Sequence, residues 1–146
     1  MNANFEIAIA KSDAEILATY DVMKQLRPHV ARAEYVPLVR LAQDEIGFQV
    51  AAVKQGGEIV GATGFRLCRS LGWGKFLYVD DLVTDEKHRS TGVGKAAFDW
   101  LVAYAREHEC AELRLDSAVY RHGAHRFYLR ERMDIACFNF KLELSA

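Results

Sequence analysis

Apolar and polar residues follow the period of a strand in some stretches of the chain and the period of a helix in others. Residues 5–10 alternate, which predicts a short first strand. Ser12 and Glu15 then have the spacing of a capping box, in which both side chains satisfy free amides at a helix start. Apolar residues at helical spacing continue to Leu26, and Pro28 ends this predicted helix.

A second amphipathic helix is expected over about residues 34–45. Its inward face is predicted to hold Leu38, Leu41 and Ala42. Gly47 is expected to end it, because glycine permits the left-handed conformation at which helices commonly stop.

The middle of the chain predicts an antiparallel meander. Residues 48–54 and 58–67 are rich in strand-forming residues and are joined by Gln55-Gly56-Gly57. Glycines at this junction permit the positive φ angles of a tight hairpin. Residues 70–74 predict a second turn, followed by a strand over 75–84.

The second half of the chain changes to alternating strands and helices. We expect a helix over about 92–108, a strand over 112–117, a helix over about 123–132 and a last strand over 136–144. The long helix has an apolar stripe suited to packing on a sheet, made of Ala97, Phe98, Leu101, Val102 and Ala105. Together these elements predict an α/β fold with a mixed, mostly antiparallel sheet flanked by helices.

Length and composition are typical of one globular domain. The 146 residues are 51% apolar and 27% charged, so we expect a single domain over residues 1–146 with a sizeable core. Nineteen basic and 20 acidic residues give a net charge of −1, which argues against nucleic-acid binding. The N-terminal region has charges where a signal peptide needs an apolar core, and no stretch approaches the roughly 20 apolar residues of a membrane span. The expected location is the cytoplasm, with no membrane partner.

Cysteines and histidines do not form a recognisable metal or disulfide pattern. Cys68, Cys110 and Cys137 are odd in number and lie outside CxxC spacing, so neither a disulfide framework nor a zinc site is predicted. No acid or cysteine stands at ligand spacing from the histidines of the second half, so no metal is expected. Surface roles are expected for His88, His122 and His125.

The segment from Asp85 to Ala97, DEKHRSTGVGKAA, predicts an anion site. Gly92 and Gly94 open the long helix, where the backbone can approach a ligand and first-turn N–H groups lack intrahelical partners. The helix dipole favours negative charge there. A Walker A loop is excluded because Ala96 stands where Ser or Thr is required, and Ala97 breaks the GxGxxG dinucleotide fingerprint.

Two motifs carry a resemblance to a known family. The run from Leu82 to Gly94 resembles the acetyl-CoA-binding motif of the GNAT N-acetyltransferase superfamily, Arg/Gln-x-x-Gly-x-Gly/Ala after a strand. Further on, Ala124-His125-Arg126-Phe127-Tyr128 resembles the family's Ala-x-x-Phe-Tyr helix. The order of elements matches as well, so the resemblance covers nearly the whole chain. It implies the GNAT fold and direct transfer of an acetyl group from acetyl-CoA to a primary amine.

The resemblance also assigns cofactor-binding residues. Backbone groups of Leu82, Val83 and Thr84 would pair with the pantetheine arm like an added strand. Backbone amides of the following loop would hold the pyrophosphate, namely those of Arg89, Ser90, Thr91, Gly92, Val93, Gly94 and Lys95.

Catalytic roles are implied for Tyr128 and Asp80. Tyr128 matches the tyrosine that protonates the leaving thiolate in many GNAT enzymes. Asp80 maps onto the first acid of a pair that removes the amine proton, through water, in polyamine-type members. Since adjacent strand residues face opposite sides of a sheet, Asp80 and Asp81 are expected to serve different roles. Arg121 stands where the family often has asparagine, so a side-chain bond to the cofactor there is not implied.

The acceptor pocket of such folds is built largely from the first two helices, their loop and the last strands. Here that region offers Tyr20, Arg27, His29, Glu34, Tyr35 and Asp44. Acids at Glu34, Asp44, Asp80 and Asp81 favour a cationic amine such as a polyamine, an aminoglycoside or a lysine side chain. A small-molecule acceptor is favoured over a protein, and both stay open. The resemblance also implies a homodimer.

Two other functions stay open at this point. A non-catalytic module that binds acetyl-CoA as a sensor would keep the glycine loop but would need neither Tyr128 nor Asp80. The presence of both favours the enzyme. An unrelated α/β domain whose glycine turn binds another anion would show no preference for coenzyme A over ADP.

Overall fold

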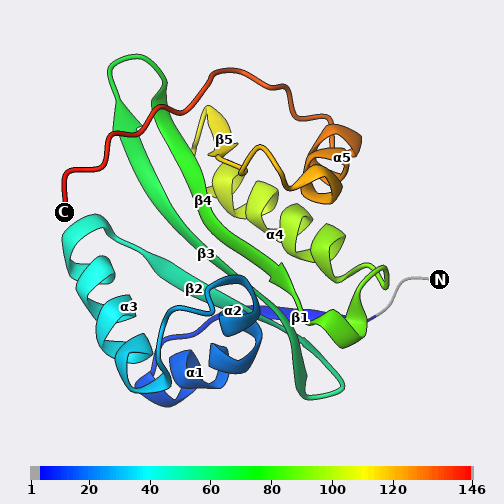
Figure 1. Ribbon diagram of the computed structural model, residues 1–146. Helices are drawn as coiled ribbons and strands as arrows, with labels where there is room; N and C mark the ends of the chain where they lie inside the picture. Colours follow the sequence, from blue (N-terminus) through cyan, green and yellow to red (C-terminus); the bar gives the residue numbers. More distant parts are fainter. Residues whose placement is uncertain (1–3, 146) are drawn as a thin grey trace. The chain divides into compact units, whose positions relative to one another are not determined.

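The computed structural model describes residues 4–145, which divide into two compact units with the boundary between Arg114 and Leu115. A five-stranded sheet with the strand order β1-β2-β3-β4-β5 belongs to the first unit, apart from Leu115, the last residue of β5 (Figure 1). The strands are β1 Glu6–Ile9, β2 Gln49–Gln55, β3 Glu58–Ser70, β4 Gly74–Thr84 and β5 Glu112–Leu115. The helices are α1 Asp13–Ala18, α2 Tyr20–Leu26, α3 Arg32–Ile46, η1 Glu86–His88, α4 Val93–Glu107 and, in the second unit, α5 His122–Arg130. Within residues 4–145, every helix is too short or too polar to cross a membrane.

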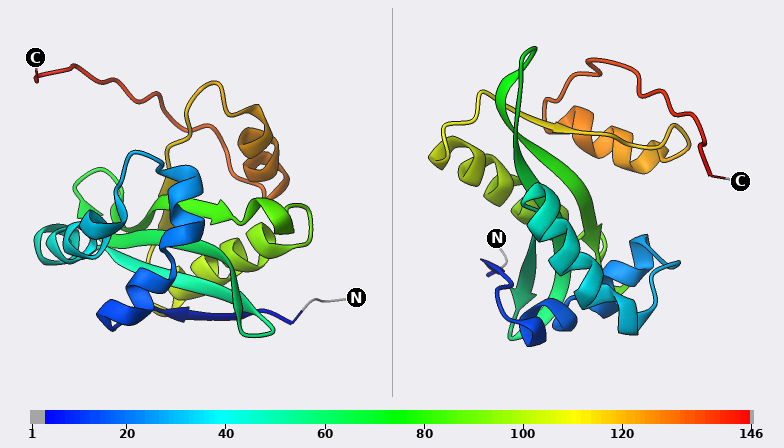
Figure 2. Two further views of the ribbon diagram at one scale, coloured as in Figure 1. Left: turned by 60° about the horizontal axis from the view of Figure 1, so that its bottom comes forward. Right: turned by 90° about the vertical axis from the view of Figure 1, so that its left-hand side faces the viewer.

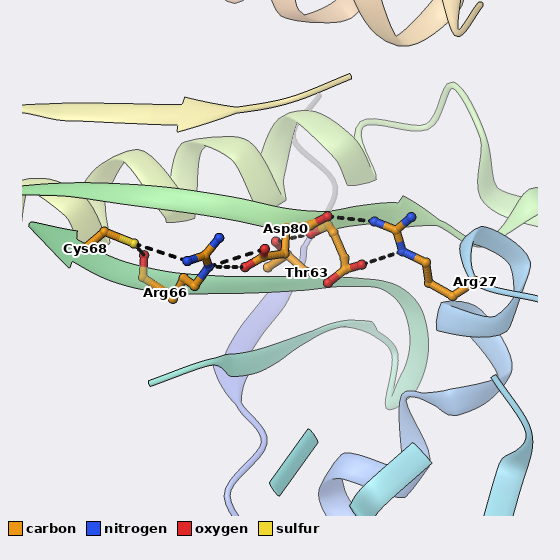
Figure 3. A network of polar contacts seen from close by, with 6 residues as sticks. Arg27, Thr63, Arg66, Cys68 and Asp80 are labelled. Carbon is orange, nitrogen blue, oxygen red and sulfur yellow. Dashed lines mark hydrogen bonds and ion pairs between the residues drawn. The ribbon is translucent and has the colours of Figure 1, made fainter. Parts of the chain in front are cut away.

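Sequence patterns predicted the sheet well. The pairs β1–β2, β2–β3 and β3–β4 are antiparallel. The hairpin between β2 and β3 turns at Gly56 and Gly57, whose φ angles of 58° and 81° are of the positive kind that glycine permits. The chain then crosses through α4 to β5, which runs in the same direction as β4 (Figure 3). The expected mixed, mostly antiparallel sheet flanked by helices is therefore confirmed.

The sheet separates two apolar cores. On one face α1, α2 and α3 bury residues such as Ile16, Tyr35 and Val39 against the sheet. On the other face the first turns of α4 bury Val93 and Ala97. The right-hand view of Figure 2 shows α2 (blue) and α4 (yellow-green) on opposite sides of the strands. The sheet thus holds the helix start of α4 and the helices α1–α3 at fixed positions on its two faces.

Two helix predictions need correction. The predicted first helix is interrupted at Thr19, which separates α1 from α2. The buried Thr19 hydroxyl is hydrogen-bonded to Ile16 O and to the Tyr35 hydroxyl, each over 2.7 Å, so its side chain competes with regular helix bonding. In α3 the inward residues are Tyr35 and Val39, whereas the predicted Leu38 and Leu41 are about half exposed.

The predicted last strand over 136–144 is wrong for the described residues. Residues 133–145 carry neither helix nor strand. Their apolar side chains do alternate, but each is more than 80% exposed at Phe138, Phe140, Leu142 and Leu144. A strand needs a neighbour to complete its backbone hydrogen bonds, and alternation alone does not supply one.

The contact between β3 and α4 depends on Gly61. A Cβ atom at Gly61 would lie 2.6 Å from Val93 Cγ1 and 3.1 Å from the carbonyl oxygen of Val83. We therefore expect Gly61→Ala to lower the free energy of unfolding by about 1–3 kcal/mol, the usual cost of overpacking. Chemical denaturation measures this loss. Gly72→Ala is the control, because a Cβ there would contact nothing within 4 Å.

A second substitution tests the cause of that loss. Val93→Ala removes the methyl group that the new Cβ would meet. The free energy of unfolding should therefore fall less in the double variant than the sum of the losses in the two single variants. Strictly additive losses would show that Gly61 is needed for another reason.

Candidate functional site

Two adjacent carboxylates lie at an irregularity in β4. The register between β3 and β4 shifts there, since Gly64 pairs with Asp81 but Phe65 pairs with Val79. Asp80 is therefore the extra residue of a β-bulge. Bulges of this kind redirect a side chain and are common beside active sites.

The bulge corrects the expectation that the two acids face opposite sides. Asp80 Oδ2 forms an ion pair with Arg66 Nε over 3.0 Å (Figure 3). Asp81 lies against Gly64, where a Cβ would come within 2.4 Å of its Oδ2 atom. Because positions 64 and 66 of β3 share a face, both carboxylates are on the same side of the sheet. The two acids can therefore serve one site.

Arg27, the residue that caps the end of α2, fixes the position of Asp81. Its Nε donates to Asp81 Oδ1 over 2.7 Å, and its Nη2 donates to the backbone oxygen of Asp80 over 2.9 Å (Figure 3). Thr63 adds a hydrogen bond from its hydroxyl to the backbone oxygen of Asp81. The Asp81 side chain is only 12% exposed, whereas that of Arg27 is 43% exposed. One guanidinium thus bridges the buried acid and the surface.

Asp81 forms part of the wall of a cavity of about 130 Å³ between the sheet and helices α2 and α3. Most of the wall is apolar or aromatic, and Asp81, Arg27 and Lys24 are its charged members. The remaining residues of the wall are Tyr20, Met23, Val30, Tyr35, Leu38, Val39, Phe48 and Val50.

Half of the residues predicted for an acceptor pocket line this cavity. Tyr20, Arg27 and Tyr35 line it. The other three predicted residues, His29, Glu34 and Asp44, are exposed and do not line it. Of the acids expected to attract a cationic amine, Glu34 and Asp44 therefore lie away from the cavity.

Burial raises the pKa of Asp81 above the usual aspartate value, and the neighbouring Asp80 charge acts in the same direction. The hydrogen bond and positive charge of Arg27 oppose this rise. The folded protein therefore holds this proton to a higher pH than the unfolded chain does. Between the two pKa values, the contribution of Asp81 to stability falls as the pH rises.

Replacing Arg27 by glutamine is expected to raise the pKa of Asp81 further, because the group that favours its ionised form is lost. Carbon-detected NMR titration of the Asp81 carboxyl group measures the change. Arg32→Gln is the matched control, since Arg32 pairs with the exposed Asp21. A lower Asp81 pKa in Arg27→Gln would contradict the assigned role of the guanidinium.

The segment predicted as an anion site lies at the start of α4. Gly92 precedes the helix with φ 94°, a conformation that suits glycine. No side chain caps the first-turn N–H groups of α4, and no acidic residue stands in that turn. By contrast, α1 has a full capping box between Ser12 and Glu15 and acids in its first turn. The N-terminal turn of α4 therefore has the arrangement of backbone N–H groups that suits an anion.

The loop before α4 is anchored to α2. Gln25 donates a hydrogen bond to Asp85 Oδ1 over 3.0 Å and accepts one from Glu86 N over 2.9 Å. His88 is held by Asp85, and the Thr91 hydroxyl donates to the backbone oxygen of His88. Arg89, Ser90, Thr91 and Gly92 remain exposed. No local sequence pattern indicates the role of Gln25, because its partners lie about 60 residues away along the chain.

The end of β4 offers backbone groups along one edge. On one side Leu82, Val83 and Thr84 pair with β3. On the other side β5 starts beside Lys75, whose oxygen accepts a hydrogen bond from Ala111 N. A strand of four residues spans about 13 Å, whereas the eleven residues of β4 span about 36 Å. The backbone of 82–84 therefore extends beyond β5, as a pairing site for an extended ligand requires (Figure 3).

The second unit contains Tyr128 on α5. Tyr128 is partly buried beside Phe127, with ring centroids 5.6 Å apart. Burial raises the pKa of its phenol, while the positive charge of Arg121 lowers it. On the same unit His125 is hydrogen-bonded to the backbone oxygen of Ala118. Within residues 4–145, no group of three His, Cys, Asp or Glu side chains is arranged to hold a metal ion.

Sequence reasoning missed several residues of the site. Met23, Leu38 and Phe48 line the cavity, but apolar residues at core spacing give no sign of such a role. Arg66, the partner of Asp80, could have been identified as a candidate site residue from the sequence, because it is a charged residue within an apolar strand.

Comparison with known proteins defines the class of this fold. Residues 15–133 match the model of the acetyltransferase (GNAT) family. An uncharacterized N-acetyltransferase of Bacillus subtilis, YhdJ, is 28% identical over 117 residues, which are 80% of this chain and 82% of that protein. This chain therefore belongs to the acetyltransferase (GNAT) family and is a GNAT-type N-acetyltransferase.

Solved structures have the same fold. A transcriptional regulator from Bacillus halodurans matches with a TM-score of 0.84 at 17% identity, over 97% of this chain and 100% of that one. A ribosomal-protein-alanine N-acetyltransferase from Brucella melitensis matches with a TM-score of 0.81 at 17% identity, with the same coverage. An aminoglycoside N-acetyltransferase in complex with CoA matches with a TM-score of 0.80 at 12% identity, over 99% of this chain and 98% of that one. At these identities the likeness concerns the fold.

Proposed function

We propose that this protein transfers the acetyl group of acetyl-CoA directly to a primary amine of a small molecule. The start of α4 is the observation that carries the proposal, because its N-cap Gly92 has no capping side chain and its first turn presents backbone N–H groups and no acid to an anion. Backbone amides of residues 89–95 would hold the pyrophosphate, and the free edge of residues 82–84 would pair with the pantetheine arm. The CoA complex of the aminoglycoside N-acetyltransferase with the same fold supports this choice of cosubstrate.

The reaction requires one proton to leave the amine and one to reach the departing thiolate. Acetyl-CoA supplies the acetyl group, so that a carbon–nitrogen bond forms as the carbon–sulfur bond breaks. Asp80 would accept the amine proton through a water molecule, since its carboxylate is partly exposed and is oriented by Arg66. Tyr128 would donate the proton to the thiolate, because its raised pKa keeps the phenol protonated at neutral pH.

Calorimetric titration of the purified protein with acetyl-CoA, coenzyme A and ADP tests the cosubstrate. We expect acetyl-CoA to bind at least tenfold more tightly than ADP, because ADP lacks the pantetheine arm that the β4 edge would pair with. Release of free thiol in the presence of an amine then tests the transfer. A protein that binds acetyl-CoA without any thiol release across an amine panel would instead be a sensor. Equal affinity for ADP and coenzyme A would indicate a general anion site.

A homodimer is part of the same proposal. The alternating apolar side chains of residues 138–144 are exposed, which is typical of a segment that pairs with a partner. Sedimentation equilibrium of the full chain determines the oligomeric state.

A further inference from the structure

The acceptor class can be narrowed from the cavity at Asp81, on the assumption that the proposed transfer takes place there. The wall is apolar except for a few charged groups, so the occupant must bring an apolar body. A cavity of about 150 Å³ lined by apolar side chains binds benzene. The volume here is about 130 Å³, which suits one aromatic ring or a branched aliphatic group.

The charges of the wall argue against a polyamine or aminoglycoside. Lys24 and Arg27 bring two positive charges, and Asp81 brings one negative charge. The negative charge is already paired with Arg27 over 2.7 Å. A ligand with several ammonium groups would therefore meet a wall of net positive charge. A ligand with one amine and one anionic group would match it.

Arg27 has the geometry to bind that anionic group. Its hydrogen bonds to Asp81 and to the Asp80 backbone use two of the five N–H donors of a guanidinium. The side chain is 43% exposed, so its remaining donors can reach a ligand. A carboxylate is the natural partner, since it accepts two parallel hydrogen bonds from arginine.

We propose that the acceptor is a free hydrophobic α-amino acid whose side chain fills this cavity and whose carboxylate binds Arg27. Its amine then lies at the Asp80–Asp81 pair, where an amine proton has two nearby carboxylates. The cavity and the charge pattern belong to the first unit alone, so the proposed contacts do not depend on the position of the second unit.

Calorimetry of the full chain without cosubstrate tests the class with four probes. L-Phenylalanine has an apolar ring, an amine and a carboxylate. Of these, 2-phenylethylamine lacks the carboxylate and 3-phenylpropanoate lacks the amine, while spermidine has amines but no ring. We expect L-phenylalanine to bind at least tenfold more tightly than each of the others. Tighter binding of spermidine would overturn the proposal, and so would equal binding of 2-phenylethylamine.

Leu38→Trp locates the binding site. Leu38 lines the cavity and is 46% exposed, so a larger side chain can enter the cavity without disturbing a buried core. We expect this variant to weaken L-phenylalanine binding at least tenfold. Leu41→Trp is the matched control, because Leu41 lies one turn further along α3, is 54% exposed and does not line the cavity. Equal losses in both variants would overturn the assignment of the cavity.

The same probes separate this inference from the proposed function. If L-phenylalanine binds in the cavity but acetyl-CoA does not bind at all, the transfer proposal fails and the amino-acid site stands. If acetyl-CoA binds and spermidine alone releases thiol, the transfer proposal stands and the amino-acid acceptor is wrong.

Discussion

Gly92→Asp is expected to weaken acetyl-CoA binding by about 100-fold or more. Gly92 precedes α4 with φ 94°, so any side chain there is strained. An aspartate also brings a negative charge to the helix start that would hold the pyrophosphate. Two unit charges 4 Å apart interact by about 4 kcal/mol at the effective dielectric constant of a protein surface, which is enough for such a loss. Calorimetric titration with acetyl-CoA measures it.

Two further variants separate strain, bulk and charge. Gly57→Asp places the same charge at a glycine with φ 81° in the β2–β3 hairpin, where a Cβ meets nothing within 4 Å. It should lose stability but keep its acetyl-CoA affinity. Gly92→Ala adds a Cβ 3.8 Å from the Phe5 ring, which is an ordinary contact. Its affinity for acetyl-CoA should therefore fall by no more than about tenfold. Normal binding by a folded Gly92→Asp protein would show that the pyrophosphate lies elsewhere.

Local patterns predicted the fold because most of its elements are specified by near neighbours in the sequence. The capping box of Ser12 and Glu15 forms as expected, with both hydrogen bonds close to 3 Å. Gly47 ends α3 in the left-handed conformation, with φ 70°. Such features need no information from distant parts of the chain.

Sequence patterns did not predict the features that depend on partners far away along the chain. Alternation along β4 predicted opposite faces for Asp80 and Asp81, but the bulge opposite Gly64 places them on one face. The break at Thr19 depends on a hydrogen bond to Tyr35, sixteen residues away. The C-terminal segment alternates without forming a strand in the described residues, because alternation does not identify the strand with which it pairs.

The candidate site was predicted only in part, for a related reason. The glycine start of α4 is continuous in sequence, so its residues could be assigned from the motif. The cavity is assembled from α2, α3, β2 and β4, and its apolar members look like ordinary core residues. Among the acids expected to attract a cation, Glu34 and Asp44 are exposed, and only Asp81 lines the cavity. Counting charges along a sequence therefore cannot show which acids the fold brings to the cavity.

Tyr128→Phe is expected to lower kcat by about 100-fold or more while the affinity for acetyl-CoA stays within about twofold. Only the phenolic hydroxyl is removed, and a positioned general acid typically contributes about 10²–10⁴-fold. The ring and its packing against Phe127 are retained. Thiol-release kinetics with an accepted amine measure kcat, and calorimetry measures the affinity. Tyr120→Phe is the control, because Tyr120 belongs to the same unit and is 76% exposed.

The pH dependence distinguishes proton donation from a structural role. Burial raises the pKa of Tyr128, so the phenol stays protonated at neutral pH and loses its proton only in strongly alkaline solution. Turnover of the unchanged protein should therefore fall on the alkaline side as the phenol ionises, and this fall should be missing in Tyr128→Phe. Arg121→Gln should move the fall to higher pH, because the positive charge of Arg121 lowers the pKa of Tyr128. Unchanged turnover in Tyr128→Phe would show that water or another group protonates the thiolate.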